Sequence, residues 1–416
     1  MRRSPLLPIF LIVLVDVLGL TIIIPLLAIY SESFGASPLV ASLLIPTYAV
    51  CQLVAGPFLG RLSDRHGRRP ILLVSQVGTL VGFIMLAEAQ TLWMVFVGRA
   101  LDGLTAGNLA VAQAYIADHT PPERRARAFG LIGIAFGLGF LAGPAVTAWL
   151  SGYGYAAPFW AAAGLSATSI LGTWFLLPRD PPTAARPADG SARPRLGVLD
   201  WGRYVEYFRR PALRGLLVQF FVYMFAFTLF TGGFALFAER HLMWDGRYFT
   251  PREIGLTFAG AGLVGAIVQG GLMGRLVARL GEHGLAVAGF ATLAAGYLVL
   301  GFTETITFLV LSTVLSAFGG SVVRPTITSL VTQLAARDEQ GVILGLTQSL
   351  SSLAAITAPP IAGLLIQHDL GPAWAWLAAG VAAIGFLIAP MGTGRAQAEA
   401  RAQARAADDA RDQGVA

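Results

Sequence analysis

Long apolar segments recur along the whole chain, and they limit its fold more than any other feature. A helix needs about 20 mostly apolar residues to cross a bilayer. Lipid offers no partner for backbone N–H and C=O groups, so each segment must be helical. The composition agrees, because only 12% of the residues are charged, whereas soluble domains carry about 25%. We predict an all-α membrane protein with twelve transmembrane helices, at residues 8–30, 38–59, 71–89, 93–117, 128–150, 157–177, 214–238, 254–273, 285–302, 306–332, 342–366 and 372–392.

The basic residues are arginines, and most of them lie in short loops between the apolar segments. Arg240, Arg247 and Arg252 lie on one side of the membrane, between the seventh and eighth predicted helices, and the other loop arginines lie on the opposite side. Because cytoplasmic loops carry the excess of basic residues, we expect a multi-pass protein of the inner membrane with both termini in the cytoplasm. This placement explains the net charge of +6 without a nucleic-acid partner.

The two halves of the chain repeat one another. Gly60–Leu62 returns as Gly274–Leu276, and Gly143–Pro144 corresponds to Ala358–Pro359, both after about 215 residues. That interval contains an even number of predicted helices, so the two six-helix repeats lie parallel in the membrane. We therefore predict an N-terminal six-helix bundle at 1–177, a cytoplasmic linker with an amphipathic helix at 178–213, a C-terminal six-helix bundle at 214–392 and a cytoplasmic tail at 393–416.

Four stretches resemble the signatures of the major facilitator superfamily. Residues 60–69 match G-x-L-x-D-R-x-G-R-R at every fixed position. The other three are Val97–Gly103 with its intramembrane arginine, Gly133–Pro144 with its glycines, and Asp16–Pro25. The resemblance covers essentially the whole chain. It implies the major facilitator fold, with two parallel bundles around a cavity, and the activity of a proton-driven drug antiporter.

Within that family the chain resembles the tetracycline exporters. The residues that carry this resemblance are Gly137–Gly139, Ala142–Pro144 and Gln340–Gly345. The ninth predicted helix departs from the pattern, since Leu285–Phe290 contains no acid where those exporters carry one.

Three charged residues lie inside predicted helices of the first half. Asp16 lies near the middle of the first helix, where an ionised carboxylate costs about 2.5–3.5 kcal/mol unless it faces a cavity, pairs with a cation or binds a proton. Arg99 and Asp102 are three residues apart and share one helix face. Arginine does not release its proton in proteins, so we expect Asp16 to couple transport to protons, with Arg99 and Asp102 setting when it ionises. The alternatives are a static tie between Asp16 and an arginine, and a self-contained Arg99–Asp102 pair.

The loop at residues 60–70 is predicted to be a tight hairpin that its glycines allow to turn. Asp64 in this loop does not contribute to the excess of basic residues that sets the membrane orientation. An anion at a helix N-terminus is stabilised by about 0.3–1 kcal/mol. The resemblance implies a conformational latch in which Asp64 meets the start of the eleventh helix and the loop arginines pair with Asp118. The alternative is that the arginines only set the orientation. The latch candidates are Gly60, Asp64, Arg65, Gly67, Arg68, Arg69 and Asp118.

Small residues form a stripe along the fifth predicted helix. Such stripes let helices approach closely, and a proline removes a backbone hydrogen bond and kinks the helix. The residues alone leave open whether the stripe serves ordinary packing or seals the two halves against leakage, and only the resemblance favours the seal. The stripe consists of Gly133, Gly137, Gly139, Gly143 and Pro144.

Polar and aromatic residues inside the helices are candidates for a substrate cavity. Aromatic rings beside a few amides suit a bulky amphipathic ligand. Arg324, which precedes Pro325, is either a contact for an anionic or polar substrate group or a side chain that snorkels or caps the kink. The candidates are Asn108, Gln113, Tyr115, Phe136, Gln219, Tyr223, Phe225, Gln269, Arg324 and Gln348.

Taken with the resemblance, these features predict a secondary active transporter that exports small amphipathic compounds, such as drugs or tetracycline-like molecules, by proton antiport and alternating access. The alternatives are a sugar or metabolite facilitator or symporter of the same fold, and a receptor or scaffold. No HExxH, GxSxG, CxxC or GxxxxGK[ST] pattern occurs, so we expect neither an enzyme nor an ATP-driven pump. The single cysteine, Cys51, rules out a thiolate metal site. We expect a monomer whose partners are the substrate, protons and the bilayer, with no cofactor or metal.

Overall fold

The computed structural model describes residues 6–120, 125–177, 206–334 and 339–389. Most of the predicted linker and the whole tail lie outside these residues. The first half contains α1 (Leu6–Ile23), α2 (Leu27–Glu32), α3 (Pro38–Ser42), α4 (Leu44–His66), α5 (Arg68–Ala87), α6 (Leu92–Leu104), α7 (Asn108–His119), α8 (Arg125–Leu150), a 3-10 turn η2 (Ser151–Tyr153) and α9 (Ala156–Leu176).

The second half is also helical apart from one small hairpin. Its strands pair antiparallel, with Met243 opposite Tyr248. The elements are α11 (Pro211–His241), β1 (Met243–Trp244), β2 (Arg247–Tyr248), α12 (Pro251–Ile267), a π-helical turn η4 (Val268–Leu272), α13 (Met273–Leu300), α14 (Ile306–Gln333), α15 (Gln340–Gln367) and a last helix, Gly371–Ala389.

The prediction of an all-α membrane protein is confirmed. Among the described residues, nine helical segments are long and apolar enough to cross a membrane, and Pro8–Ile23 is a shorter apolar helix. Within α13 the backbone leaves the helical conformation at Gly281, whose φ is 67° and ψ is 168°, so two helices meet there. The structure thus separates the helix that ends before Gly281 from the ninth predicted helix, which follows it. The fourth predicted helix is instead broken into α6 and α7 by the non-helical stretch 105–107.

The break between α6 and α7 lies where this segment packs closely on α4 and α5. The Gly107 N–H donates to Ser75 Oγ of α5 at 3.2 Å. A Cβ at Gly103 would lie 2.5 Å from the Tyr48 carbonyl oxygen of α4. A side chain at either glycine would therefore push the broken helix away from its neighbours.

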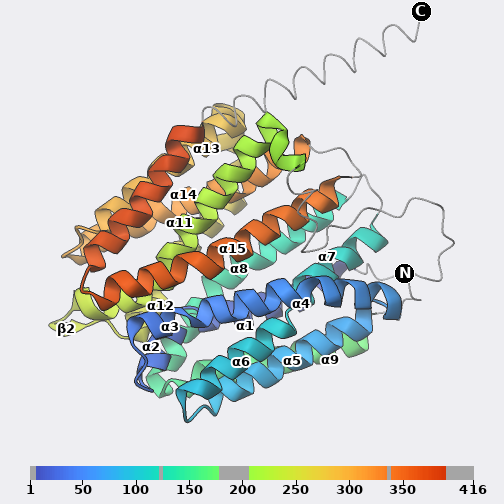
Figure 1. Cartoon of the computed structure of the whole chain (residues 1–416), viewed down its shortest axis with the longest axis horizontal. Helices are drawn as coiled ribbons and strands as arrows, with labels where there is room; N and C mark the ends of the chain where they lie inside the picture. The colour runs from blue at the N-terminus through green and yellow to red at the C-terminus, as the bar shows by residue number, and fades with distance from the viewer. Residues whose placement is uncertain (1–5, 121–124, 178–205, 335–338, 390–416) are drawn as a thin grey trace, which may run out of the picture.

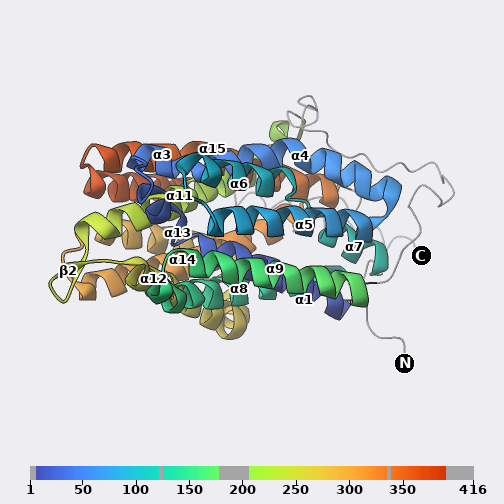
Figure 2. The same ribbon diagram turned by 90° about the horizontal axis from the view of Figure 1, so that it is seen from below.

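The two halves lie close together at the end of the bundle that carries the β hairpin, and they spread apart toward the opposite end (Figure 1). Figure 2 shows from below that the long helices run roughly along one common axis. We call these the hairpin end and the arginine-rich end, the latter carrying the turn between α4 and α5. At the hairpin end a Cβ at Gly255 of α12 would lie 2.7 Å from the Pro144 carbonyl oxygen of α8, and one at Gly363 of α15 would meet Ser42 of α3. Toward the arginine-rich end, Gly133 and Gly345 have open space beside them. The structure is thus closed at the hairpin end.

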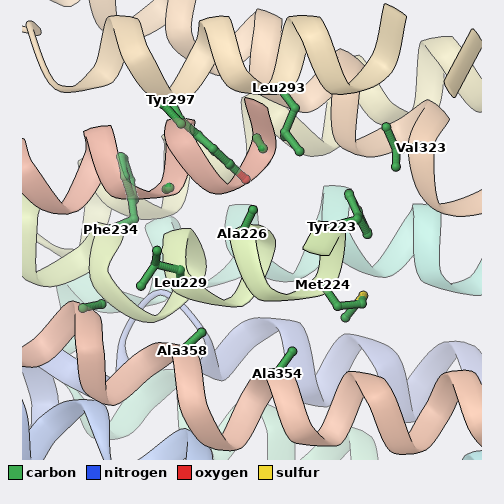
Figure 3. Packing of buried hydrophobic residues seen from close by; sticks show 14 of the residues in the cluster. Tyr223, Met224, Ala226, Leu229, Phe234, Leu293, Tyr297, Val323, Ala354 and Ala358 are labelled. Atoms are coloured by element: carbon green, nitrogen blue, oxygen red, sulfur yellow. The ribbon is translucent and has the colours of Figure 1, made fainter. Parts of the chain in front are cut away.

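The largest apolar core lies in the second half and is centred on α11. Figure 3 shows Ala226 and Leu229 on α11 between Ala354 and Ala358 of α15 on one side and Tyr297 of α13 on the other. All of these side chains are buried. This packing fixes which face of α11 remains for a cavity.

Candidate functional site

Asp16 lies in a chain of polar side chains that crosses the first half. Ser169 of α9 donates to Asp16 Oδ1 at 3.0 Å, and Gln76 of α5 donates to Ser169 Oγ at 2.8 Å. Asn108 of α7 lies beside the carboxylate. Asp16 Oδ2 is buried and has no hydrogen-bond partner among the described residues. Ser169 therefore holds one oxygen of the Asp16 carboxyl group, and Asn108 lies beside the group.

Arg99 and Asp102 of α6 pair with each other. Arg99 Nη1 lies 2.8 Å from Asp102 Oδ2, and both side chains are buried. The guanidinium also lies 4.4 Å from the ring centroid of Tyr48 on α4. The structure accordingly shows the self-contained pair, and no arginine of the described chain forms an ion pair with Asp16. Asp102 is nevertheless within electrostatic reach of Asp16.

We predict that Arg99→Gln lowers the free energy of unfolding by about 3–5 kcal/mol, because it leaves the Asp102 carboxylate buried without its cation. The double variant Arg99→Gln/Asp102→Asn is expected to recover much of this loss. Thermal unfolding of the purified protein in detergent measures both effects. The matched control is Arg61→Gln, because Arg61 is exposed on α4. Equal stability of Arg99→Gln and the control would contradict the role of the pair.

The residues predicted to form a latch surround the turn between α4 and α5. The chain turns at Gly67, whose φ is 92°. Gly60 lies within α4, since this helix continues to His66, so the expectation that Gly60 also serves the turn is wrong. Arg68 is buried and its Nη1 lies 2.5 Å from Asp64 Oδ1.

Two further latch candidates have different surroundings. Arg69 donates to the Trp174 carbonyl oxygen of α9 and lies over the indole ring. Arg65 is exposed. Asp118 belongs to α7, but its side chain lies outside the described residues. The latch between the halves stays a prediction.

A second ion pair at the arginine-rich end joins the starts of α11 and α15. Arg210 donates to both carboxylate oxygens of Glu339, at 2.8 and 2.7 Å. These hydrogen bonds raise the pKa of the Arg210 guanidinium. The pair is partly exposed to water, so it contributes little to stability.

The glycine stripe of α8 divides between two neighbours. Gly139 and Gly143 pack against Val17 and Thr21 of α1, in the same half, and Thr21 Oγ1 donates to the Gly139 carbonyl at 2.8 Å. Toward the second half, α8 presents Phe140, Pro144 and Ala148. Glycines do lie at that contact between the halves, but Gly255 and Gly262 of α12 supply them.

A cavity of about 190 Å³ opens between α8 and the second half. Its walls are largely aromatic, and the polar groups are hydroxyls, one amide and one guanidinium. Phe136, Tyr223, Gln269 and Arg324 were predicted for the cavity and line it. The other candidates are not among the described lining residues, namely Asn108, Gln113, Tyr115, Gln219, Phe225 and Gln348.

Sequence reasoning missed most of the aromatic wall. Tyr223, Phe227, Phe230 and Phe234 all line the cavity from α11. Their spacing of four, three and four residues places them on one helix face, so this stripe could have been found. Phe230 stacks on Tyr297 of α13 with ring centroids 4.9 Å apart, a contact that no local pattern indicates.

Gln269 lies on the π-helical turn η4, a kind of irregularity that is frequent at functional sites. Its Nε2 donates to the Ser321 carbonyl of α14 at 3.3 Å. Its Oε1 points toward α8, since a Cβ at Gly137 would lie 4.0 Å away. Gln269 therefore spans the cavity between the two halves.

A charged contact that sequence reasoning missed closes the hairpin end. Arg240 at the end of α11 donates to Glu32 at the end of α2, at 2.7 Å. Glu239 lies beside both groups. This ion pair joins the first half to the second, where α3 and α15 also meet.

The comparisons with known proteins agree with this architecture. A family model described as the Major Facilitator Superfamily matches residues 9–272 and 241–411. The class C tetracycline resistance protein of Escherichia coli is 32% identical over 84% of this chain and 86% of that protein. Multidrug resistance protein 2 of Bacillus subtilis (strain 168) is 25% identical over 86% of this chain and 88% of that protein. The crystal structure of the nucleoside transporter NupG has a TM-score of 0.72 at 14% identity, and covers 94% of this chain and 99% of that one.

Proposed function

Because the chain belongs to the major facilitator superfamily, we propose that it is a proton-coupled antiporter that exports small amphipathic compounds. The observation that carries this proposal is the environment of Asp16, an intramembrane carboxylate without a paired cation and with one buried oxygen left unbonded. Intramembrane acids of this kind are functional by default. The relatives named for tetracycline and multidrug resistance support drugs as the cargo.

In this proposal the arginine-rich end faces the cytoplasm, where the excess of basic loops belongs. The structure is then the inward-facing state, closed at the hairpin end by the Glu32–Arg240 pair and by the glycine contacts of α12. Substrate enters the cavity from the cytoplasm. A proton taken up by Asp16 from the outside is released inside.

Proton binding and substrate binding act through the same conformational equilibrium. Protonation removes the charge of Asp16 and so changes the free energy of each state by a different amount. The buried Arg99–Asp102 pair places a second acidic side chain within electrostatic reach of Asp16. We assign these residues to proton coupling and the aromatic cavity to the cargo. The latch consists of Asp64, Arg65, Gly67, Arg68, Arg69 and Asp118. The unit of function is a monomer in the inner membrane with both termini in the cytoplasm.

The test uses proteoliposomes with an imposed inward proton gradient and a dye that reports the internal pH. Tetracyclines, fluoroquinolones and cationic dyes are added one at a time. We expect a compound-dependent proton flux that protein-free liposomes lack. Absence of flux with every compound, together with counterflow of a labelled sugar or metabolite, would replace antiport of drugs by the facilitator or symporter alternative.

A further inference from the structure

Arg324 carries the only charge among the described residues that line the cavity. It lies on α14, and its guanidinium is 5.6 Å from the ring centroid of Phe136 on α8. Tyr223 of α11 is within electrostatic reach. The side chain therefore extends toward Phe136 in the space between the two halves.

The charge of Arg324 is not neutralised within the described part of the chain. Its guanidinium forms no ion pair and no hydrogen bond there, and its contact is the face of the Phe136 ring. The intramembrane carboxylates Asp16 and Asp102 are engaged in the first half. Arginine does not release its proton in proteins, and the Arg324 side chain is exposed, so a ligand can reach it from the cavity. The cavity thus provides a fixed positive charge that a bound anion would neutralise.

We propose that the cavity selects aromatic monoanions, with the acid group on Arg324 and the ring system against the aromatic wall of α11 and α8. This inference rests on the proposed function, because it names the substrate class of the same site. The guanidinium fork matches the two oxygens of a carboxylate. Phe136 holds its plane, and Tyr223, Phe227 and Phe230 offer rings to an aromatic ligand.

The hydroxyls and the amide of the cavity complete the site. Ser316, Ser321 and Gln269 line it on the α14 and η4 side. They suit the carbonyl and hydroxyl groups of an oxygenated ring system. A cationic amphipath finds no carboxylate among the described lining residues and would be repelled by Arg324.

An anionic cargo also changes the charge balance of antiport. When one proton enters and one monoanion leaves, both movements carry positive charge inward. When the exported compound is neutral, only the proton carries charge. Export of an anion should therefore respond more steeply to an inside-negative potential than export of a neutral analogue.

The experiment measures equilibrium binding to the purified full-length chain in detergent, without a proton gradient. The probes are 2-naphthoate and 2-naphthamide, which share a ring system and differ in charge. We expect the wild type to prefer the naphthoate by about tenfold or more. Arg324→Gln should abolish this preference, because it weakens naphthoate binding much more than naphthamide binding. Arg324→Lys keeps the charge and should retain part of the preference.

The matched control is Arg275→Gln, since Arg275 is exposed on α13 and is not among the lining residues. It should bind both probes as the wild type does. A naphthoate preference that survives Arg324→Gln would overturn the proposal, as would tighter binding of 2-naphthylmethylammonium than of naphthoate to the wild type. Thermal unfolding of each variant separates misfolding from loss of the charge, and Arg324→Lys tests the site if Arg324→Gln does not fold.

This assay is separable from the test of antiport. Charge-selective binding without any proton flux would leave the site standing and overturn the coupling mechanism. Proton flux with tetracyclines but no charge preference in binding would support the coupling mechanism and overturn the proposed selectivity for anions.

Discussion

Replacing Asp16 by asparagine is expected to abolish uphill transport while downhill exchange of the substrate survives. Asparagine keeps the size of the side chain and accepts the hydrogen bond from Ser169, which now reaches the carboxylate at 3.0 Å. It cannot bind and release a proton. The transporter would still alternate between its two states, but substrate movement would no longer be tied to the proton gradient.

The measurement compares accumulation against a gradient with exchange of labelled for unlabelled substrate in the same proteoliposomes. Asp369→Asn serves as the control, because Asp369 is exposed near the hairpin end and its positive φ of 59° also suits asparagine. The control should behave as the wild type in both assays. Wild-type accumulation by Asp16→Asn would contradict its role as the proton carrier.

Replacing Gly262 by valine is expected to prevent closure of the hairpin end and to block transport. A Cβ at this position of α12 would collide with the Phe140 carbonyl oxygen and with Leu141 Cα on α8. These are backbone atoms, so the helices must separate. Overpacking of this kind costs about 1–3 kcal/mol, and a coupling of that size shifts a conformational equilibrium by about 5–150-fold.

Gly260→Val is the matched control, since Gly260 is exposed on the same helix with no atom close to its Cβ position. Spin labels at Tyr153 and Tyr248, two exposed residues near the hairpin end in opposite halves, report the separation in a Cys51→Ser background. Gly262→Val should lengthen the label distance and lose transport, and Gly260→Val should do neither. An unchanged distance distribution in Gly262→Val would show that this contact does not limit closure.

How the first half pairs its charges depended on packing. The sequence left open whether Arg99 pairs with Asp16 or with Asp102. Asp102 lies three residues away on the same helix, and a long arginine side chain can also reach an acid on another helix, such as Asp16. The structure pairs Arg99 with Asp102 and gives Asp16 to Ser169. The spacing of three residues on one helix allows the Arg99–Asp102 pair. The Asp16–Ser169 hydrogen bond forms only because α9 packs beside α1.

The cavity shows the same division. The helical spacing of Tyr223, Phe227, Phe230 and Phe234 lies in the sequence and defines one face of α11. That this face lines a cavity depends on α15 covering another face of α11 (Figure 3). Placing Arg324 opposite Phe136 required both halves of the chain.

The sequence by itself determined that the membrane segments are helical and that charged residues lie inside them. Lipid cannot form hydrogen bonds with the backbone, so a long apolar segment in the membrane must be helical. This requirement applies to each segment independently of the others. The tertiary structure alone decided the break at 105–107, the glycine contacts that α12 makes with α8, and the Glu32–Arg240 pair between the halves. Those features depend on which helix faces which, and that is set by packing between residues far apart in the chain.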